Sequence, residues 1–346
     1  MTATASDLRE RLCRAAARTA EYPYKCWAFG EAVAMRGLLE AARATGDDRY
    51  RRVVEGEFDR WWSARRGILG YEDHVTPGVP LLALARSDRR WMPAARSLGG
   101  LFARVPRVRG VPVHRPDLEP FRSHVWVDCL YTDGPFLALL GRETGDARWS
   151  DLACAHARAY LEALWDPATG LFWHGYDAET GRANAVHWGR GNGWAMMGLL
   201  DLLRHLPPHH AFRRPFAAVV ERQADALIAL QDAGGHWHTV VDRADTYLES
   251  SIAAMMAWAL GQAVRLGALP ASKRDLALRA AESARAAALA ASDADGRLTG
   301  VSEATPAGDL AAYAARPTGV FPWGQGPLLL ALADAVAPEA AGEAPR

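Results

Sequence analysis

The chain has 346 residues with 40 basic and 40 acidic side chains, so its formal net charge at pH 7 is zero. This balance supplies no bulk attraction to nucleic acid or to an anionic membrane surface, and we expect neither as a partner. Residues 1–18 include Asp7, Arg9 and Glu10 where an export signal would need an apolar run, and no uninterrupted apolar stretch of membrane-spanning length follows. We therefore expect a cytoplasmic protein.

Several common kinds of site are excluded because their motifs are missing. The chain has no Gly-x-Ser-x-Gly elbow and no phosphate loop of the Gly-Lys-Ser or Gly-Lys-Thr type, which argues against a serine hydrolase and a nucleotide-binding enzyme. His236 and His238 have no recognisable third metal ligand. No Cys-x-x-Cys pair occurs among the cysteines, which are Cys13, Cys26, Cys129 and Cys154. We expect neither a metal nor a cofactor.

Amphipathic periodicity predicts about twelve helices along the chain. In the second of them, Val33, Leu38 and Ala41 recur near helical spacing. In chain order the expected helices span 7–20, 27–44, 47–64, 78–86, a stretch ending near 105, 126–143, 147–164, 190–205, 209–231, 246–266, 272–291 and 324–335.

A turn device recurs between helices at Thr45-Gly46-Asp47, Arg86-Ser87-Asp88 and Thr144-Gly145-Asp146. Glycine takes the left-handed position that ends a helix, and aspartate accepts from the free amides that begin the next one. An aromatic residue follows each aspartate three positions later, at Tyr50, Trp91 and Trp149. This regular layout indicates an internal repeat of helical hairpins.

The links between the expected helices alternate between short and long. The short links are plain turns near residues 45, 87, 144, 206–208 and 267–270, whereas the long links span 65–77, 107–125, 165–189, 232–245 and 293–323. If hairpins stand side by side in a ring, every second link emerges at the same end, so all long links share one face. We predict an all-α fold, an (α/α)6 barrel of six helical hairpins that forms a single domain over residues 1–346, with an open solenoid as the alternative.

The glycine-rich stretch from residue 187 to residue 194 is the first candidate for a binding site. Its glycines alternate with His187, Trp188, Arg190 and Trp194. Arginine matches a carboxylate with a rigid fork of donors, and tryptophan faces stack on flat rings, so the stretch is suited to gripping an acidic sugar. The alternative is a glycine-rich helix start whose tryptophans belong to the core.

Two aspartates on the long-link side are the candidates for acid and base chemistry. Asp128 lies in a helical turn otherwise made of apolar and aromatic residues, where burial disfavours the charged form of a carboxyl group and lets it hold a proton at neutral pH. Asp73 is the expected second carboxylate, although it could instead cap the following helix. Asp133 is expected to be a turn or polar-face residue.

Together these residues resemble the unsaturated uronyl hydrolases of glycoside hydrolase families 88 and 105, and family 105 more closely. The resemblance rests on landmarks in family order, namely Asp73-His74 with Pro77-Gly78, Trp126-Val127-Asp128 with Leu130-Tyr131, Gly170-Leu171-Phe172-Trp173-His174-Gly175, Trp188-Gly189-Arg190-Gly191-Asn192-Gly193-Trp194, Gly235-His236-Trp237, Glu249-Ser250-Ser251 and Trp323-Gly324-Gln325-Gly326.

The resemblance implies a six-hairpin α/α barrel that hydrates the C4=C5 double bond of an unsaturated uronic acid at the non-reducing end of lyase-generated oligosaccharides, with pectin-type substrates favoured. Asp128 would be the general acid and base, and Asp73 its neighbour. The residues expected to bind the small acidic oligosaccharide are Trp126, His174, Arg190, Trp194, His187, Trp188 and His124.

Several alternatives stay open at this level. His114 or His124 could supply the histidine that family 105 members bring from the loop before the catalytic aspartate. Another sugar-processing barrel, such as an inverting glycosidase or an epimerase, fits the same residues, as does a carbohydrate-binding barrel without turnover. The aglycone, the linkage and the oligomeric state are not determined.

Overall fold

The computed structural model describes residues 4–24, 29–75 and 78–338. Within these ranges it contains thirteen α-helices, which are α1 Ala5–Ala20, α2 Phe29–Thr45, α3 Arg49–Arg65, α4 Gly78–Ser87, α5 Met92–Ala103, α6 Cys129–Thr144, α7 Ala147–Leu164, α8 Gly189–His205, α9 Arg213–Ala229, α10 Ser250–Arg265, α11 Arg274–Ala290, α12 Leu310–Ala314 and α13 Pro322–Val336. Each of the twelve expected helices has a counterpart. The expected start of the second helix, Trp27, lies outside the described residues.

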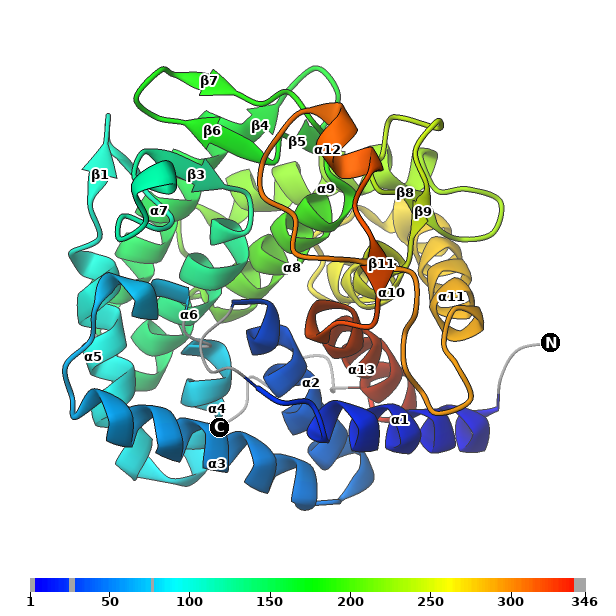
Figure 1. The fold of residues 1–346 in the computed structure, drawn as a ribbon, viewed down its shortest axis with the longest axis horizontal. Coiled ribbons are helices and arrows are strands. Elements are labelled where there is room, and N and C mark those ends of the chain that lie inside the picture. Colours follow the sequence, from blue (N-terminus) through cyan, green and yellow to red (C-terminus); the bar gives the residue numbers. More distant parts are fainter. Residues whose placement is uncertain (1–3, 25–28, 76–77, 339–346) are drawn as a thin grey trace.

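The helices form two concentric layers (Figure 1). The inner helices contact one another in the order α2, α4, α6, α8, α10, α13 and back to α2, which closes a ring. The outer helices α1, α3, α5, α7, α9 and α11 each precede their inner partner in the chain. The predicted (α/α)6 barrel is therefore confirmed, and the open solenoid is excluded because α13 packs against α2.

Ring closure depends on a close approach between α2 and α13. A Cβ atom at Gly326 would lie 2.4 Å from the carbonyl carbon of Val33, so only a glycine lets the two backbones touch at this level. The surrounding inner faces are apolar, and Val33, Leu38 and Leu329 are fully buried.

The repeated turns have the expected geometry. Gly145 ends α6 with a φ of 70°, in the left-handed region. Asp146 caps α7 by accepting from the backbone N–H of Arg148 at 3.1 Å, and Asp88 accepts from Arg90 in the same way. Asp47 also accepts from the second residue after it, although the N-cap position of α3 belongs to Asp48. These short turns fix the antiparallel order of neighbouring hairpins.

The long links lie on one side of the ring and contain all the strands of the described residues (Figure 1). These antiparallel strands have two or three residues each and are β1 Arg107–Val108, β2 Val111–Pro112, β3 His124–Trp126, β4 Trp165–Asp166, β5 Leu171–Phe172, β6 Gly175–Asp177, β7 Arg182–Ala183, β8 Trp237–His238, β9 Leu248–Glu249, β10 Val301–Ser302 and β11 Thr318–Gly319. The long links also hold two of the four 3-10 helices of the described residues, η1 Tyr71–Val75 and η3 Glu119–Phe121. The other two are η2 Arg89–Trp91, in a short turn, and η4 Ala271–Lys273, after another.

Two local expectations need correction. Trp126 was expected to begin a helix, but it belongs to strand β3, because residues 124–126 pair with β6, and α6 begins only at Cys129. The short helix α12 was expected to be part of a loop. None of the helices in the described ranges has the length and apolar character needed to cross a lipid bilayer.

Candidate active site

Asp128 is the N-cap residue of α6, yet its side chain does not cap the helix. Aspartate at this position ordinarily accepts from the first free amides, as Asp146 does. The Asp128 side chain is instead only 2% exposed and lies beside His174 of the link between α7 and α8. Its carboxyl group is therefore buried without being used to stabilise its own helix.

The pairing of β3 with β6 brings His174 to Asp128. The backbone N–H of Val127 donates to the carbonyl oxygen of His174 at 2.9 Å, just beyond the Trp126 to Gly175 pair. As a result His174 Nε2 lies 3.4 Å from Asp128 Oδ2, and the His174 side chain is fully buried. Burial lowers the pKa of His174, which the neighbouring Asp128 carboxyl opposes only in part, so the imidazole is neutral near pH 7.

Aromatic rings surround this pair. The ring centroid of Trp188 lies 4.2 Å from that of His174, and the Trp126 ring lies 5.8 Å from it. His114 stacks on Trp126 at 5.2 Å and is 3% exposed, whereas His124 is half-buried beside Phe121 at 5.8 Å. Of the two histidines that the sequence left open, His114 is therefore the one that packs against the aromatic wall.

Several buried polar atoms of this cluster have no hydrogen-bond partner within the described part of the chain. They are Asp128 Oδ2, His174 Nε2, Trp126 Nε1 and Trp188 Nε1. Buried polar groups in folded proteins are nearly always paired, so a concentration of unpaired ones in one place marks a site that a ligand completes. Donors and an acceptor are both present, which suits a hydroxylated ligand.

Arg190, in the first turn of α8, is committed to contacts within the protein. One terminal nitrogen donates to Ser302 Oγ at 2.6 Å and lies 3.2 Å from Glu249 Oε1, and the other donates to the carbonyl oxygen of Glu303 at 2.9 Å. The guanidinium carbon lies 4.4 Å from the centroid of the Trp188 ring. Burial lowers the pKa of Arg190, and the charges of Glu249 and Asp128 oppose this lowering.

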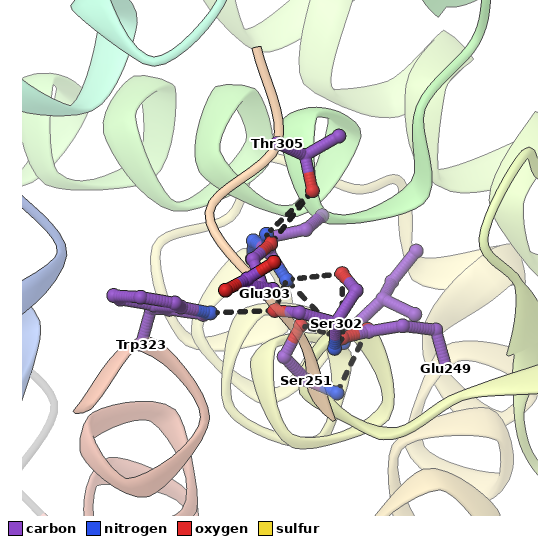
Figure 2. A network of polar contacts seen from close by, with 8 residues as sticks. Glu249, Ser251, Ser302, Glu303, Thr305 and Trp323 are labelled. Carbon is purple, nitrogen blue, oxygen red and sulfur yellow. Dashed lines mark hydrogen bonds and ion pairs between the residues drawn. The ribbon is translucent and has the colours of Figure 1, made fainter. Parts of the chain in front are cut away.

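Glu249 holds this arrangement together (Figure 2). It is the N-cap residue of α10, and its carboxylate accepts from the backbone N–H of Ser251 at 2.9 Å and of Ile252 at 3.2 Å. It also accepts from the backbone N–H of Ser302 at 2.8 Å. The fully buried Glu249 thus fastens the link before α13 to α8 and α10. Glu249 belongs to one of the sequence landmarks of the family, but its sequence context predicted no particular role for it.

Asp73 is fully buried but lies in a different set of contacts. Its carboxylate accepts from Trp61 Nε1, Arg65 Nε and the backbone N–H of Gly70, each at 2.9 Å. No hydrogen bond or ion pair of the described residues joins Asp73 to Asp128. Among the described residues no hydrogen bond shows Asp73 capping α4, and Asp73 itself belongs to η1. Its approach to Asp128 stays a prediction.

The remaining predicted residues occupy different positions. His187 lies between two aspartates, with Nδ1 2.8 Å from Asp242 Oδ2 and Nε2 3.3 Å from Asp166 Oδ2. Trp194 is fully buried in α8, and its ring lies 4.9 Å from that of Tyr131. Both side chains are therefore buried and in contact with other protein groups, and their binding of a substrate stays a prediction.

The expectation for Asp133 was wrong. It was expected to be a turn or polar-face residue, but it is fully buried where α6 packs against α7. Thr132 Oγ1 and Tyr160 Oη donate to its carboxylate, and His156 Nδ1 lies 2.9 Å from Asp133 Oδ2. An aspartate can be buried at position 133 because His156 and Tyr160 of α7 are its partners, and the sequence of α6 does not reveal them.

Sequence reasoning also missed Tyr313, the buried aromatic residue of α12. Its hydroxyl lies 2.6 Å from His174 Nδ1 and is bonded to Asn184 and Gly308 as well. The two residues are separated by 139 positions in the chain. The alternating pattern of helices gave no signal for a five-residue helix inside a long link.

Comparison with known proteins agrees with this geometry. The family model of Glycosyl Hydrolase Family 88 matches residues 11–337. The unsaturated rhamnogalacturonyl hydrolase YesR of Bacillus subtilis is 28% identical over 317 residues, which cover 89% of each protein. A crystal structure of a possible GH105 member from Salmonella enterica superposes with a TM-score of 0.88 at 23% identity, covering 96% of this chain and 94% of that one. The unsaturated glucuronyl hydrolase of Bacillus sp. GL1 gives a TM-score of 0.75 at 19% identity, with 95% of both chains covered.

Proposed function

The chain belongs to Glycosyl Hydrolase Family 88, and from this membership we propose that it removes a 4,5-unsaturated uronic acid from the non-reducing end of short oligosaccharides. The similarity to YesR, an unsaturated rhamnogalacturonyl hydrolase, favours pectin-type products of polysaccharide lyases as substrates. The reaction is a hydration of the C4=C5 double bond and does not begin at the anomeric carbon.

Asp128 is the general acid in the first step. Its protonated carboxyl group donates the proton to C4, and positive charge develops at C5, where the ring oxygen stabilises it. The cluster of Trp126, His174 and Trp188 surrounds this carboxyl group, which is only 2% exposed, and keeps bulk water away from it.

The second step uses the same group as a base. The Asp128 carboxylate accepts a proton from a water molecule as the water oxygen bonds to C5, which restores the carboxylic acid. The product is a hemiketal that opens, and the aglycone leaves with its glycosidic oxygen. A group that acts first as acid and then as base must change protonation state near the working pH.

The observation that carries this proposal is the unpaired carboxyl group of Asp128. It is buried, it lies at the loop end of an inner helix, and Oδ2 has no hydrogen-bond partner among the described residues. A carboxyl group kept for stability would be paired, because an unsatisfied buried polar group costs about 1–3 kcal/mol. Retaining this cost is reasonable for a group that must exchange protons with a ligand.

Arg190 contributes in a different way from the one first expected. Its terminal nitrogens are occupied by Glu249 and by the link that holds Ser302 and Glu303, so we assign it the placement of Trp188 and a positive charge near the site. That charge favours an acidic sugar over a neutral one even without a direct bond.

The test is a panel of lyase-generated disaccharides from pectin-type and glycosaminoglycan-type polymers, followed by the ultraviolet absorbance of the conjugated double bond. Hydration removes this absorbance, with the pectin-type products expected to react fastest. Release of the aglycone with the absorbance intact would show ordinary glycosidic cleavage and would refute the proposal. Binding without any reaction on the whole panel would do the same.

A further inference from the structure

We propose that Tyr313 fixes the tautomer of His174, so that the ring presents an N–H to Asp128 Oδ2 and the acid proton of Asp128 is carried by Oδ1. Tyr313 is thus a positioning residue, which acts on the reaction through His174. The assignment of the tautomer stands on the hydrogen-bond network alone, whereas its catalytic consequence rests on the proposed function.

The network is anchored by Asn184, whose amide orientation is determined by its neighbours. The backbone N–H of Gly175 lies 3.1 Å from Asn184 Oδ1, and this atom must therefore be the carbonyl oxygen, because an N–H needs an acceptor. The opposite atom, Nδ2, lies 3.0 Å from the carbonyl oxygen of Gly308 and donates to it. Asn184 Nδ2 is thus a donor in its second contact too, which is to the hydroxyl oxygen of Tyr313 at 2.9 Å.

The direction of the Tyr313 hydroxyl follows from this. Its oxygen accepts from Asn184 Nδ2 and from the backbone N–H of Gly308 at 3.3 Å. Both neighbours are donors, so neither can receive the hydroxyl hydrogen. Within the described residues the remaining hydrogen-bond contact of this hydroxyl is with His174 Nδ1 at 2.6 Å, so the hydroxyl donates to it. Burial raises the pKa of Tyr313, so the hydrogen stays on the oxygen.

His174 Nδ1 is therefore an acceptor and carries no hydrogen. Because burial lowers the pKa of His174, the ring is neutral and its single hydrogen sits on Nε2. That nitrogen lies 3.4 Å from Asp128 Oδ2 and forms no hydrogen bond within the described residues. The N–H of His174 consequently faces the buried oxygen of the proposed acid.

This orientation matters for proton transfer. An imidazole nitrogen that bears hydrogen has no lone pair in the ring plane, so it cannot take the proton of Asp128 away from the substrate. The N–H also occupies the region of Oδ2, which leaves Oδ1 as the oxygen that gives its proton to C4 and later receives one from water. With the opposite tautomer, a basic lone pair would face Oδ2 and compete for the acid proton.

The first experiment measures the tautomer directly. The full chain, labelled with ¹⁵N in histidine, is compared by NMR with the Tyr313→Phe variant, and the His174→Gln variant identifies the His174 signals. We expect hydrogen on Nε2 in the parent, and a shift of population toward the Nδ1–H form in Tyr313→Phe. A parent His174 ring with its hydrogen on Nδ1, or a charged ring at pH 7, would overturn the proposal, and this outcome does not depend on enzymatic activity.

The second experiment measures the consequence. On an unsaturated uronyl disaccharide, we expect Tyr313→Phe to lower kcat by about 10- to 100-fold with little change in KM, by analogy with the loss caused when the partner that orients a metal-binding histidine is removed. The control is Tyr50→Phe in the outer helix α3. It removes a hydroxyl that donates to the backbone carbonyl oxygen of Cys13, and it should leave kcat unchanged. Unchanged kcat in Tyr313→Phe together with an altered tautomer would refute the catalytic part. A parent that is inactive on every substrate would instead refute the proposed function and leave the NMR result standing.

Discussion

Asp128 and Glu249 occupy the same position in two inner helices and are treated in opposite ways. Each is the N-cap residue of its helix, at the end that carries the long links, and each is almost completely buried. The Glu249 carboxylate accepts from Ser251, Ile252 and Ser302 and lies against the Arg190 guanidinium. Among the described residues, the one ion-pair contact of the Asp128 carboxyl group is with His174, whose Nε2 lies 3.4 Å from Oδ2.

The difference shows that burial alone does not identify a catalytic carboxylate. Asp73 and Asp133 are also fully buried, and both are paired as Glu249 is, with Arg65 in one case and His156 in the other. A buried ion pair or network mainly fixes geometry, because the attraction only offsets the loss of hydration. What distinguishes Asp128 is that its buried Oδ2 has no hydrogen-bond partner among the described residues.

The largest effect should come from Asp128→Asn. We expect turnover to fall by about 10²- to 10⁴-fold, the usual contribution of a general acid or base, while ligand binding persists. The melting temperature should not fall, because the change removes a buried carboxyl that lacks partners. Rates of absorbance loss and thermal unfolding measure the two effects, with Asp151→Asn on the outer helix α7, whose side chain is 73% exposed, as the control. A near-parental rate in Asp128→Asn would contradict the proposed catalytic role of Asp128.

Glu249→Gln should act mainly on stability. Removing the negative charge leaves the Arg190 guanidinium buried without its ion-pair partner, and such a loss costs about 3–5 kcal/mol of unfolding free energy. Urea titration checks this value. The matched control is Glu303→Gln, because the Glu303 side chain is exposed and only its backbone carbonyl joins the network. Equal unfolding free energies for the two variants would mean that the buried Glu249 charge does not stabilise the fold.

Asp73→Asn tests whether Asp73 acts as a structural carboxylate, as Glu249 does, or takes part in the reaction, as proposed for Asp128. If it resembles Glu249, the loss of a charged acceptor for Arg65 and Trp61 lowers the unfolding free energy by about 1–3 kcal/mol. This is the result that we expect in urea titration. A variant with full stability and a strongly reduced kcat would instead place Asp73 beside Asp128 as a participant in the reaction.

The smallest effect concerns pH. His205, near the end of α8, is buried, and burial together with Arg204, Arg36 and Arg86 lowers its pKa well below 6.5. His174 is shifted in the same direction, with burial as its main cause. Below 6.5 the unfolded chain then binds more protons than the folded one, so stability is fully present above this pH and decreases as the pH falls.

Thermal unfolding followed as the pH is lowered through this window measures the effect. We expect His205→Gln to flatten the decrease. His209→Gln, in which the replaced side chain is exposed, should leave it unchanged. A steeper decrease in His205→Gln would contradict the depressed pKa.

The sequence predicted the fold well because the fold depends on local signals. Helical periodicity, the repeated caps near Gly46, Ser87 and Gly145, and the alternation of short and long links are all properties of neighbouring residues. They predicted twelve barrel helices and the face that carries the long links. The signal failed for the start of α6 and for α12, because strand pairing over residues 124–126 and tertiary support of a short helix lie outside a local pattern.

The candidate site was predicted only in part. Asp128, His174, Trp126 and Trp188 lie together as proposed. Arg190 was expected to bind the acidic sugar, but in the structure its partners are Glu249 and two residues more than a hundred positions away in the chain, Ser302 and Glu303. Partners so distant are chosen by packing, and a single sequence carries no sign of them.

From the sequence alone one could predict a ring of helical hairpins, the face that holds its polar loops, and the aromatic residues that flank Asp128 in the chain, because the signal for each lies within one helix or one link. Only the tertiary structure decided which buried charges are satisfied and which are left open. Hydrogen bonding is directional and short-ranged, so the placement of the links before α8 and α13 decides whether a buried carboxyl group is paired, as Glu249 is, or left without a hydrogen bond among the described residues, as Asp128 Oδ2 is.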